Sequence, residues 1–189
     1  IGLQNPPELA SFINPRAFVG PLQIVTNYTK ILELNKKDEL LNYLKIIEPR
    51  LVNIETITKA QVSYLGCLIN GISKHKPITF LGDGINKLIY FYLEIMACKN
   101  GYLFIDEIEN GFHYSILPKV WAMIAKMAEE YNCQIFATTH SLECLKSAFE
   151  KSGQNFSFFR LQSNNGSIEA IRYDNTHLKS VFEEDWDVR

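Results

Sequence analysis

The sequence predicts an α/β fold built on a parallel sheet, and residues 101–141 carry that prediction. Two short apolar runs, YLFI at 102–105 and QIFATT at 134–139, flank a segment with helical periodicity. Strands buried on both faces of a parallel sheet have continuous apolar runs of this kind. The first run is followed by Asp106 and Glu107, and the second by His140. Because open α/β sheets bind ligands at the carboxyl ends of their strands, we interpret these three residues as a site.

The segments before this stretch predict helices and a hairpin. Four prolines before residue 22 predict loops and short edge pieces over residues 1–35, without a long helix. Leucine and isoleucine at helical spacing predict an amphipathic helix over residues 37–47. The runs LVNIETIT at 51–58 and QVSYLGCLI at 61–69 predict the two strands of a hairpin. The almost wholly apolar run at 86–98 predicts a helix buried on all sides.

The segments after it continue the alternation. Residues 115–131 predict the crossover helix, with Ser115 as its cap and Pro118 in its first turn. A shorter helix is expected at 141–150. Residues 155–161 and 167–173 read as two strands that turn at Asn164-Asn165-Gly166, and an acidic tail follows.

The composition is that of a globular protein with one sizeable core. The chain has 189 residues, of which 47% are hydrophobic and 21% charged. The net charge of −2 gives no general support for nucleic-acid binding. The four cysteines form no CxxC pair, so we expect free buried thiols and a cytoplasmic protein. No apolar run reaches the roughly 20 residues that span a bilayer, so no membrane partner is expected.

The candidate site residues suit phosphoryl chemistry. An acid at the tip of a buried strand can hold Mg²⁺, which proteins bind through one or two carboxylates plus substrate phosphates. A second carboxylate beside it can orient or deprotonate a water for attack on a phosphoryl group. A histidine on the neighbouring strand can hydrogen-bond that water or the phosphate. Asp106, Glu107 and His140 are the residues for these three tasks.

The same residues resemble a known family. LFIDE at 103–107 resembles the Walker B strand of ABC-type ATPases, ENGFHYS at 109–115 their D-loop region, and ATTHS at 137–141 their switch-histidine strand. The nearest resemblance is to bacterial AAA-family proteins with an ABC/SMC-like head, including the overcoming-lysogenization-defect group. Those typically read DEPE-x-x-LHP, whereas Ile108 and Tyr114 replace the two prolines here. The resemblance implies a P-loop NTPase sheet fragment, Asp106 as the Mg²⁺ ligand, and Glu107 and His140 as catalytic residues.

A glycine-rich motif fits the same family. Leu81-Gly82-Asp83-Gly84 resembles the ABC signature motif, which often reads L-S-D-G in these AAA proteins. Small residues let backbone N–H groups approach a phosphate, and the following helix directs its positive end at it. The resemblance implies that the motif binds the γ-phosphate of ATP held by the opposite protomer of a homodimer. Gly82 stands where serine is usual, so the backbone carries more of the contact.

Within one structural domain overall, we expect an accessory region over residues 1–80 and a lobe with the signature motif, Walker B and switch histidine over residues 81–189. A Walker A loop, G-x-x-x-x-G-K-[ST], is not found in the sequence. The loop would come from an upstream segment or a partner chain, or else the head is degenerate. The chain begins with Ile1, which makes a removed upstream segment the most economical expectation.

The function implied by the resemblance is an ATPase that uses ATP and Mg²⁺ and closes as a dimer around the nucleotide. By analogy it would switch a nucleic-acid-related or antiviral defence effector, with a nuclease partner and DNA. Two alternatives stay open. One is a non-catalytic nucleotide sensor or scaffold, which the missing Walker A loop favours. The other is a metal-dependent phosphohydrolase or nuclease built on five residues: Asp106, Glu107, Glu109, His113 and His140.

Overall fold

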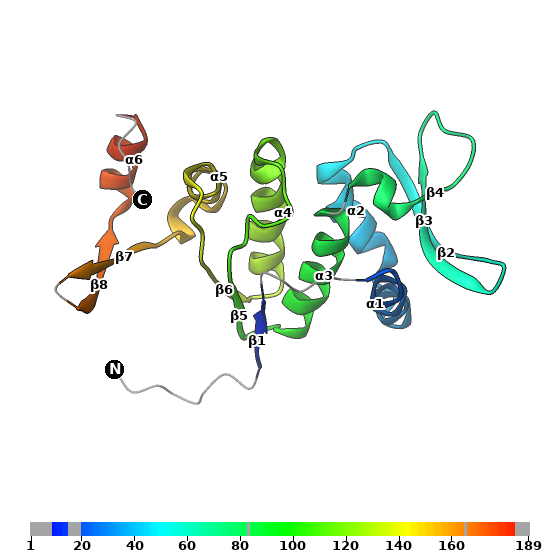
Figure 1. The fold of residues 1–189 in the computed structure, drawn as a ribbon, viewed down its shortest axis with the longest axis horizontal. Helices are drawn as coiled ribbons and strands as arrows, with labels where there is room; N and C mark the ends of the chain where they lie inside the picture. The colour runs from blue at the N-terminus through cyan, green and yellow to red at the C-terminus, as the bar shows by residue number, and fades with distance from the viewer. Residues whose placement is uncertain (1–8, 15–19, 83, 165, 184–189) are drawn as a thin grey trace.

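The computed structural model describes residues 9–14, 20–82, 84–164 and 166–183, so Asp83 of the glycine motif lies outside the described residues. A three-stranded parallel sheet forms its centre (Figure 1). Strand β5 (Tyr102–Ile105) lies between β1 (Ala10–Ile13) and β6 (Gln134–Ala137). The predicted α/β class with a parallel sheet is confirmed, and β5 has the bounds that its apolar run predicted.

Two helices bury one face of this sheet. Helix α3 (Gly84–Ala97) and helix α4 (Leu117–Glu130) share a hydrophobic core with Leu103 and Ile105 of β5, which are 0% and 2% exposed. The predicted buried helix begins two residues earlier than expected. Helix α4 begins later than expected, because a short 3₁₀ turn, η2 (Tyr114–Ile116), precedes it. The prediction that Ser115 caps α4 is wrong, since Ile116 occupies the capping position.

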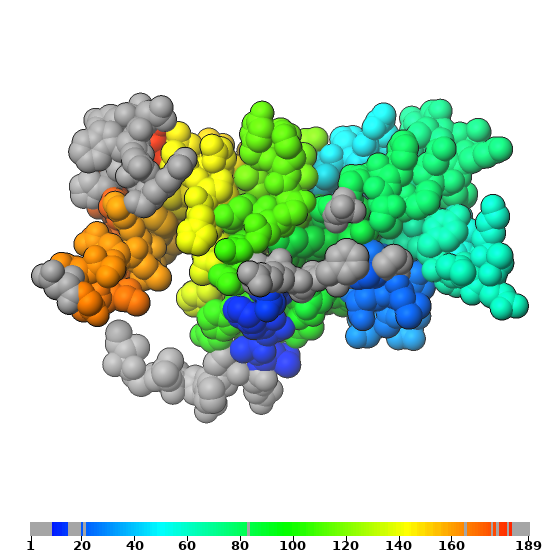
Figure 2. All heavy atoms as spheres, in the orientation of Figure 1, coloured from blue at the N-terminus to red at the C-terminus, as the bar shows by residue number. Residues whose placement is uncertain are grey.

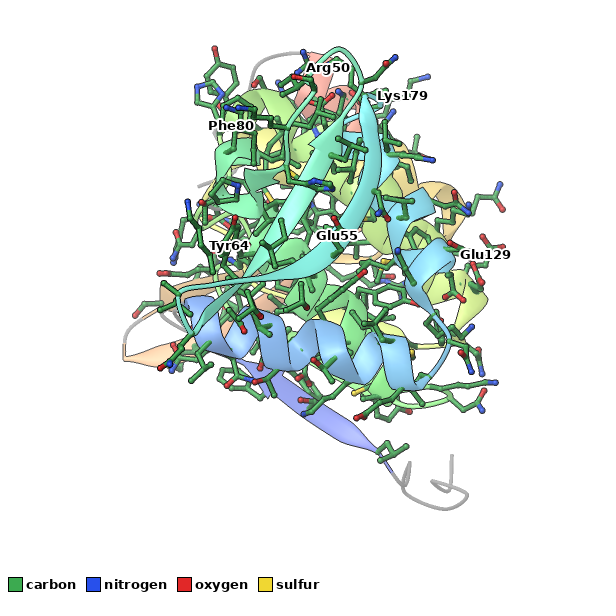
Figure 3. All side chains as sticks on the ribbon, turned by 90° about the vertical axis from the view of Figure 1, so that its right-hand side faces the viewer. Arg50, Glu55, Tyr64, Phe80, Glu129 and Lys179 are labelled. Carbon is green, nitrogen blue, oxygen red and sulfur yellow. The ribbon has the colours of Figure 1, made fainter. Side chains whose placement is uncertain are left out.

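The amino-terminal region forms two helices and a hairpin. Helix α1 (Pro21–Glu33) and helix α2 (Lys37–Ile47) precede β2 (Leu51–Lys59) and β3 (Val62–Ile69), which pair antiparallel as predicted. Figure 3 shows α1 running across the hairpin, from which Glu55 and Tyr64 project. The prediction that residues 1–35 lack a long helix is wrong. Pro21 sits at the start of α1, where a missing N–H is harmless and the fixed φ favours the helix.

The remaining elements complete the chain. Short strand β4 (Lys76–Pro77) joins the hairpin and leads into the 3₁₀ turn η1 (Ile78–Leu81). After β6 come α5 (Leu142–Ser152), the turn η3 (Gly153–Asn155), the antiparallel pair β7 (Phe158–Asn164) and β8 (Ser167–Tyr173), and α6 (Asn175–Glu183). The hairpins β2–β3 and β7–β8 lie at opposite ends of the long axis (Figures 1 and 2).

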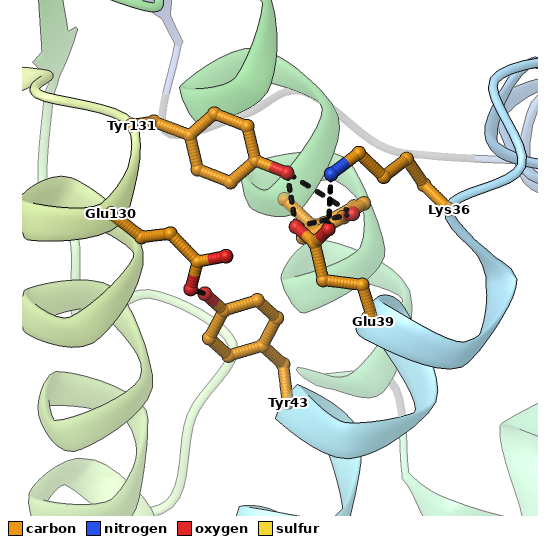
Figure 4. Close-up of polar contacts among 6 residues, drawn as sticks. Lys36, Glu39, Tyr43, Glu130 and Tyr131 are labelled. Atoms are coloured by element: carbon orange, nitrogen blue, oxygen red, sulfur yellow. Dashed lines mark hydrogen bonds and ion pairs between the residues drawn. The ribbon is translucent and has the colours of Figure 1, made fainter.

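A polar network joins α2, α3 and α4 (Figure 4). Glu39 on α2 accepts hydrogen bonds from Tyr92 on α3 at 2.9 Å, from Tyr131 at the end of α4, and from Lys36. Beside it, Tyr43 donates to Glu130. Burial raises the pKa of Tyr92 and of Tyr43, and the neighbouring carboxylates raise both further. Both phenols therefore stay protonated and act as donors that fix the three helices to one another.

All four cysteines are free and buried, as predicted. Burial is the main cause that raises the pKa of each thiol, and that of Cys133 reaches about 11. Within the described ranges, no helix is both long and apolar enough to cross a membrane.

Candidate functional site

The tips of β5 and β6 are joined by one threonine. Because Ile105 pairs with Ala137 in the sheet, the next residues, Asp106 and Thr138, face each other beyond the strand ends. The Thr138 hydroxyl donates to Asp106 Oδ1, and the Thr138 hydroxyl oxygen in turn accepts the main-chain N–H of Glu107 at 2.8 Å. The predicted strand 134–139 thus ends two residues early, and its last threonines belong to the site.

Glu107 has a backbone conformation that is uncommon for its residue type. Its φ is +45°, in the left-handed region that favours glycine and asparagine. The Asn110 side chain donates to Glu107 Oε2 at 2.5 Å, and the Asn110 N–H donates to the Glu107 carbonyl at 3.0 Å. Such conformations persist only where the surroundings determine them, and they gather at functional sites. The loop therefore fixes the direction of the Glu107 carboxylate.

The loop that follows β5, residues 106–113, is called the acid loop, and His140 is connected to it through Glu109. The His140 N–H donates to Glu109 Oε1 at 2.8 Å, although the two residues are 31 positions apart. Glu109 Oε2 is buried and has no partner among the described residues. Glu109 and His113 are four apart in the sequence, but their side chains bind different segments: Glu109 binds the His140 N–H, and His113 binds within its own turn. His113 caps η2, where its ring nitrogen accepts the Ser115 N–H at 3.3 Å.

The glycine motif lies against the same loop. Gly84 begins α3, and a Cβ there would stand 2.8 Å from the Phe112 ring and 3.2 Å from the Gly111 carbonyl oxygen. A larger residue at this position would push the acid loop away. Gly82 has a φ of +94°, and apart from its neighbours in the chain no described residue has an atom within 4 Å of an added Cβ, so a side chain there would meet open space among the described residues. Leu81 ends the turn η1 and packs against the core.

The structure thus connects the predicted residues in two ways, directly or through a loop. Asp106 and Glu107 share the Thr138 hydroxyl directly. His140 and Gly84 reach them through the loop 108–112. Sequence reasoning missed Thr138 and Asn110. A polar residue placed at the same register as Asp106, directly after the neighbouring parallel strand, is the signal that points to Thr138.

The donor set at the β5 tip suits a hard cation. A carboxylate and a hydroxyl supply oxygen ligands, which Mg²⁺ prefers. Among the described residues, Asp106 Oδ2 accepts no hydrogen bond, and no group of three or more His, Cys, Asp or Glu side chains is placed to hold a metal ion. Asp106 therefore fits a Mg²⁺ ion that takes most of its ligands from phosphates and water.

Comparison with known proteins identifies the family. The AAA ATPase domain family matches residues 14–145, so this chain belongs to it. An ATP/GTP phosphatase of Helicobacter pylori is 28% identical over 144 residues, which is 75% of this chain and 38% of that protein. A Methanocaldococcus jannaschii protein, MJECL11, is 31% identical over 109 residues, which is 58% of this chain and 90% of that protein.

Solved structures share the fold. A chain from work on ATP-driven dimerization and DNA-stimulated activation of SMC ATPases superposes with a TM-score of 0.60 at 10% identity, over 84% of this chain and 96% of that one. The Smc head domain with a coiled coil and joint from Pyrococcus yayanosii superposes with a TM-score of 0.53 at 12% identity, over 85% of this chain and 32% of that one. The fold is therefore that of an ABC/SMC-like P-loop NTPase head, as the sequence predicted, and the chain corresponds to about a third of the Pyrococcus chain.

Proposed function

We propose that this chain is part of the head of an ATP-hydrolysing ATPase. In this proposal Asp106 holds Mg²⁺, Glu107 is the general base, and His140 contacts the transferring phosphate. The observation that carries it is the Thr138 hydroxyl, which joins Asp106 to Glu107 where two parallel strands end. This edge of an α/β sheet is where ligands bind, and membership of the AAA ATPase family supports a nucleotide as the ligand.

The residues divide the chemistry between them. When bound, Mg²⁺ would neutralise charge on the nucleotide phosphates. Glu107 would accept a proton from the attacking water, for which its carboxylate must keep one direction. The left-handed backbone and the Asn110 amide hold that direction. His140 follows the tip of β6, one residue beyond Thr139, where its ring can meet the phosphate that Asp106 and Glu107 approach from β5.

A phosphate-binding loop must then come from outside this chain. The described residues leave one face of the sheet bare: Phe12, Phe104 and Phe136 lie in one row across the three strands and are 61%, 38% and 46% exposed. Parallel sheets are normally covered on both faces. A cavity of about 160 Å³ extends from this row to Asp106 and Thr138. We propose that the segment with the Walker A loop covers the row and so brings the loop to Asp106.

The finer parts of the proposal rest on resemblance. Leu81, Gly82, Asp83 and Gly84 would bind ATP held by the opposite protomer, and the homodimer would close around the nucleotide in the cytoplasm. One of the similar structures comes from work on ATP-driven dimerization of SMC ATPases, which supports this step. A nuclease partner, DNA and an antiviral defence effector are proposed by analogy with the family.

Two measurements test the proposal. Mg-ATP titrated calorimetrically into this chain should give no detectable heat of binding, because the phosphate loop is elsewhere. In the complete protein, Glu107→Gln should bind ATP and hydrolyse it at least about 100-fold more slowly, since a positioned base contributes roughly 10²–10⁴-fold. Unchanged turnover in that variant would remove Glu107 from the base role.

A second candidate is a non-catalytic nucleotide sensor or scaffold. The absence of G-x-x-x-x-G-K-[ST] from the 189 residues favours it. It predicts dimerisation or partner binding that Asp106→Asn leaves unchanged. The ATPase proposal predicts that Asp106→Asn abolishes closure driven by Mg-ATP, so the oligomeric state of this variant with and without nucleotide separates the two.

A further inference from the structure

Lys87 joins the start of α3 to the acid loop. It lies in the first turn of the helix, three residues after Gly84, and its ammonium donates to the carbonyl oxygens of Asn110 at 2.6 Å and Ile108 at 3.3 Å. The Phe91 and Phe112 rings lie 5.4 and 5.3 Å from the nitrogen. Aromatic faces and carbonyl oxygens both stabilise a cation.

The Lys87 ammonium is partly buried between two aromatic rings and two carbonyl oxygens. Burial lowers the pKa of Lys87, while the negative charges of Glu109 and Glu107 act in the opposite direction. A buried cation is costly unless its hydrogen bonds are made. Displacing the carbonyls of Ile108 and Asn110 would remove both of these acceptors from the partly buried ammonium, so the two hydrogen bonds hold the loop against α3.

Glu109 continues this connection to β6. Its Oε1 accepts the His140 N–H at 2.8 Å, and its Oε2 is buried and unpartnered among the described residues. A glutamine could accept the same hydrogen bond at a lower desolvation cost, because a buried amide costs less than a buried charge. A carboxylate at position 109 adds a negative charge that raises the pKa of Lys87, and its Oε2 remains available as an acceptor for a second donor.

We propose that Lys87 and Glu109 are positioning residues that form a brace between the Leu81–Gly84 motif and the catalytic residues Glu107 and His140. The contacts run from the first turn of α3 through Lys87 to the carbonyls of the acid loop, and through Glu109 to His140. Gly84 against Phe112 forms a second contact between the same two segments. A nucleotide held against the motif by another protomer would then change the positions of Glu107 and His140. This inference rests on the proposed function of the motif.

The brace is tested in the nucleotide-free chain by amide hydrogen exchange followed by NMR. Glu109→Gln keeps the acceptor and the shape, and Lys87→Met keeps the length and the apolar contact. Lys87→Met should speed exchange of the His140 amide at least about 5-fold, the lower end of usual coupling between sites. Coupling is reciprocal, so Glu109→Gln should change exchange of the Ile85 N–H, which donates to the Gly82 carbonyl at 3.2 Å.

Lys119→Met is the matched control. Lys119 also donates to a main-chain carbonyl, that of Ile47 at 3.2 Å, from another helix. Lys119→Met should leave the exchange rates of the His140 and Ile85 amides unchanged. If Lys87→Met alters only the amides of residues 108–110 and Glu109→Gln leaves Ile85 unchanged, the brace is rejected. Glu109→Gln decides the question if Lys87→Met does not fold.

Activity separates this inference from the proposed function. In the complete protein, each variant should lower kcat with little change in KM, and the double variant should lose less than the product of the two single losses. Wild-type protein without ATP turnover would refute the proposed function, whereas the exchange experiment would still decide whether the brace exists. Independent effects of the two substitutions on kcat would overturn the coupling.

Discussion

The hydroxyl of Thr138, directly after β6, donates to the carboxylate of Asp106, directly after β5, and this hydrogen bond joins the two strand tips that form the candidate site. The same hydroxyl oxygen accepts the Glu107 N–H at 2.8 Å. One small side chain therefore positions both acids. The contact depends on strand register, because a shift of one residue would turn Thr138 to the other face of the sheet.

Substitution of Thr138 tests this relationship. Thr138→Val keeps the shape and removes the hydroxyl, which leaves Asp106 and the Glu107 amide without that partner. ATP turnover of the complete protein should fall about 10- to 100-fold, as for other outer-shell partners of metal ligands. Thr138→Ser keeps the hydroxyl and should retain most of the activity. Equal turnover in the valine and wild-type proteins would contradict the role given to Thr138.

Glu107→Asn should separate stability from activity. The left-handed φ of +45° costs a glutamate roughly 1–2 kcal/mol and an asparagine less. We expect the free energy of unfolding to be unchanged or to rise by up to about 1 kcal/mol, measured by urea denaturation. Hydrolysis should be lost, because the shorter amide cannot act as the base. Because the shorter side chain can also lose the hydrogen bond from Asn110, Asn110→Ala is the control, and a loss of stability in Glu107→Asn greater than in Asn110→Ala would contradict strain at this φ.

The two faces of β5 should respond differently to truncation. Leu103 is fully buried in the core that it shares with α3 and α4, and Leu103→Ala should reduce the free energy of unfolding by about 2–5 kcal/mol. Phe104 is 38% exposed on the bare face, and Phe104→Ala in this chain alone should have a much smaller effect. In a protein that contains the covering segment, Phe104→Ala should become strongly destabilising. Equal effects of Phe104→Ala in both settings would show that the face stays uncovered.

Acid should weaken the network around Glu39. Burial raises the pKa of this carboxyl, but hydrogen bonds from Lys36, Tyr131 and Tyr92 outweigh it, and the folded-state pKa lies below the usual 4.5. A carboxyl with a depressed pKa stabilises the fold above its unfolded-state pKa and ceases to do so as the pH falls through the folded value. Thermal unfolding of wild type should therefore show a stability loss below about pH 4.5 that is smaller in Glu39→Gln. If the stability of wild type and of Glu39→Gln fell by the same amount as the pH was lowered, the role given to the Glu39 carboxylate would be contradicted.

Much of the fold was predictable because it depends on local patterns. Helix α2 has the bounds that its leucine spacing predicted, and β5 has those of its apolar run. Helix α1 was missed because prolines in the sequence were counted without regard to position, and Pro21 at the first helical position favours a helix. The division at residue 80 stays a prediction, although β1 from the amino-terminal part pairs with β5 in the same sheet.

For the site, the sequence by itself determined which chemical groups are present and where they stand along the chain: two acids after one buried strand, a histidine after the next, and a glycine motif before a helix. Tertiary structure alone decided how they are connected. Register placed Thr138 opposite Asp106, and packing placed the Lys87 ammonium on the acid loop and Glu109 beneath His140. Hydrogen bonds between residues about 20 to 30 positions apart have no local sequence pattern, since they form only when separate strands and helices are packed together.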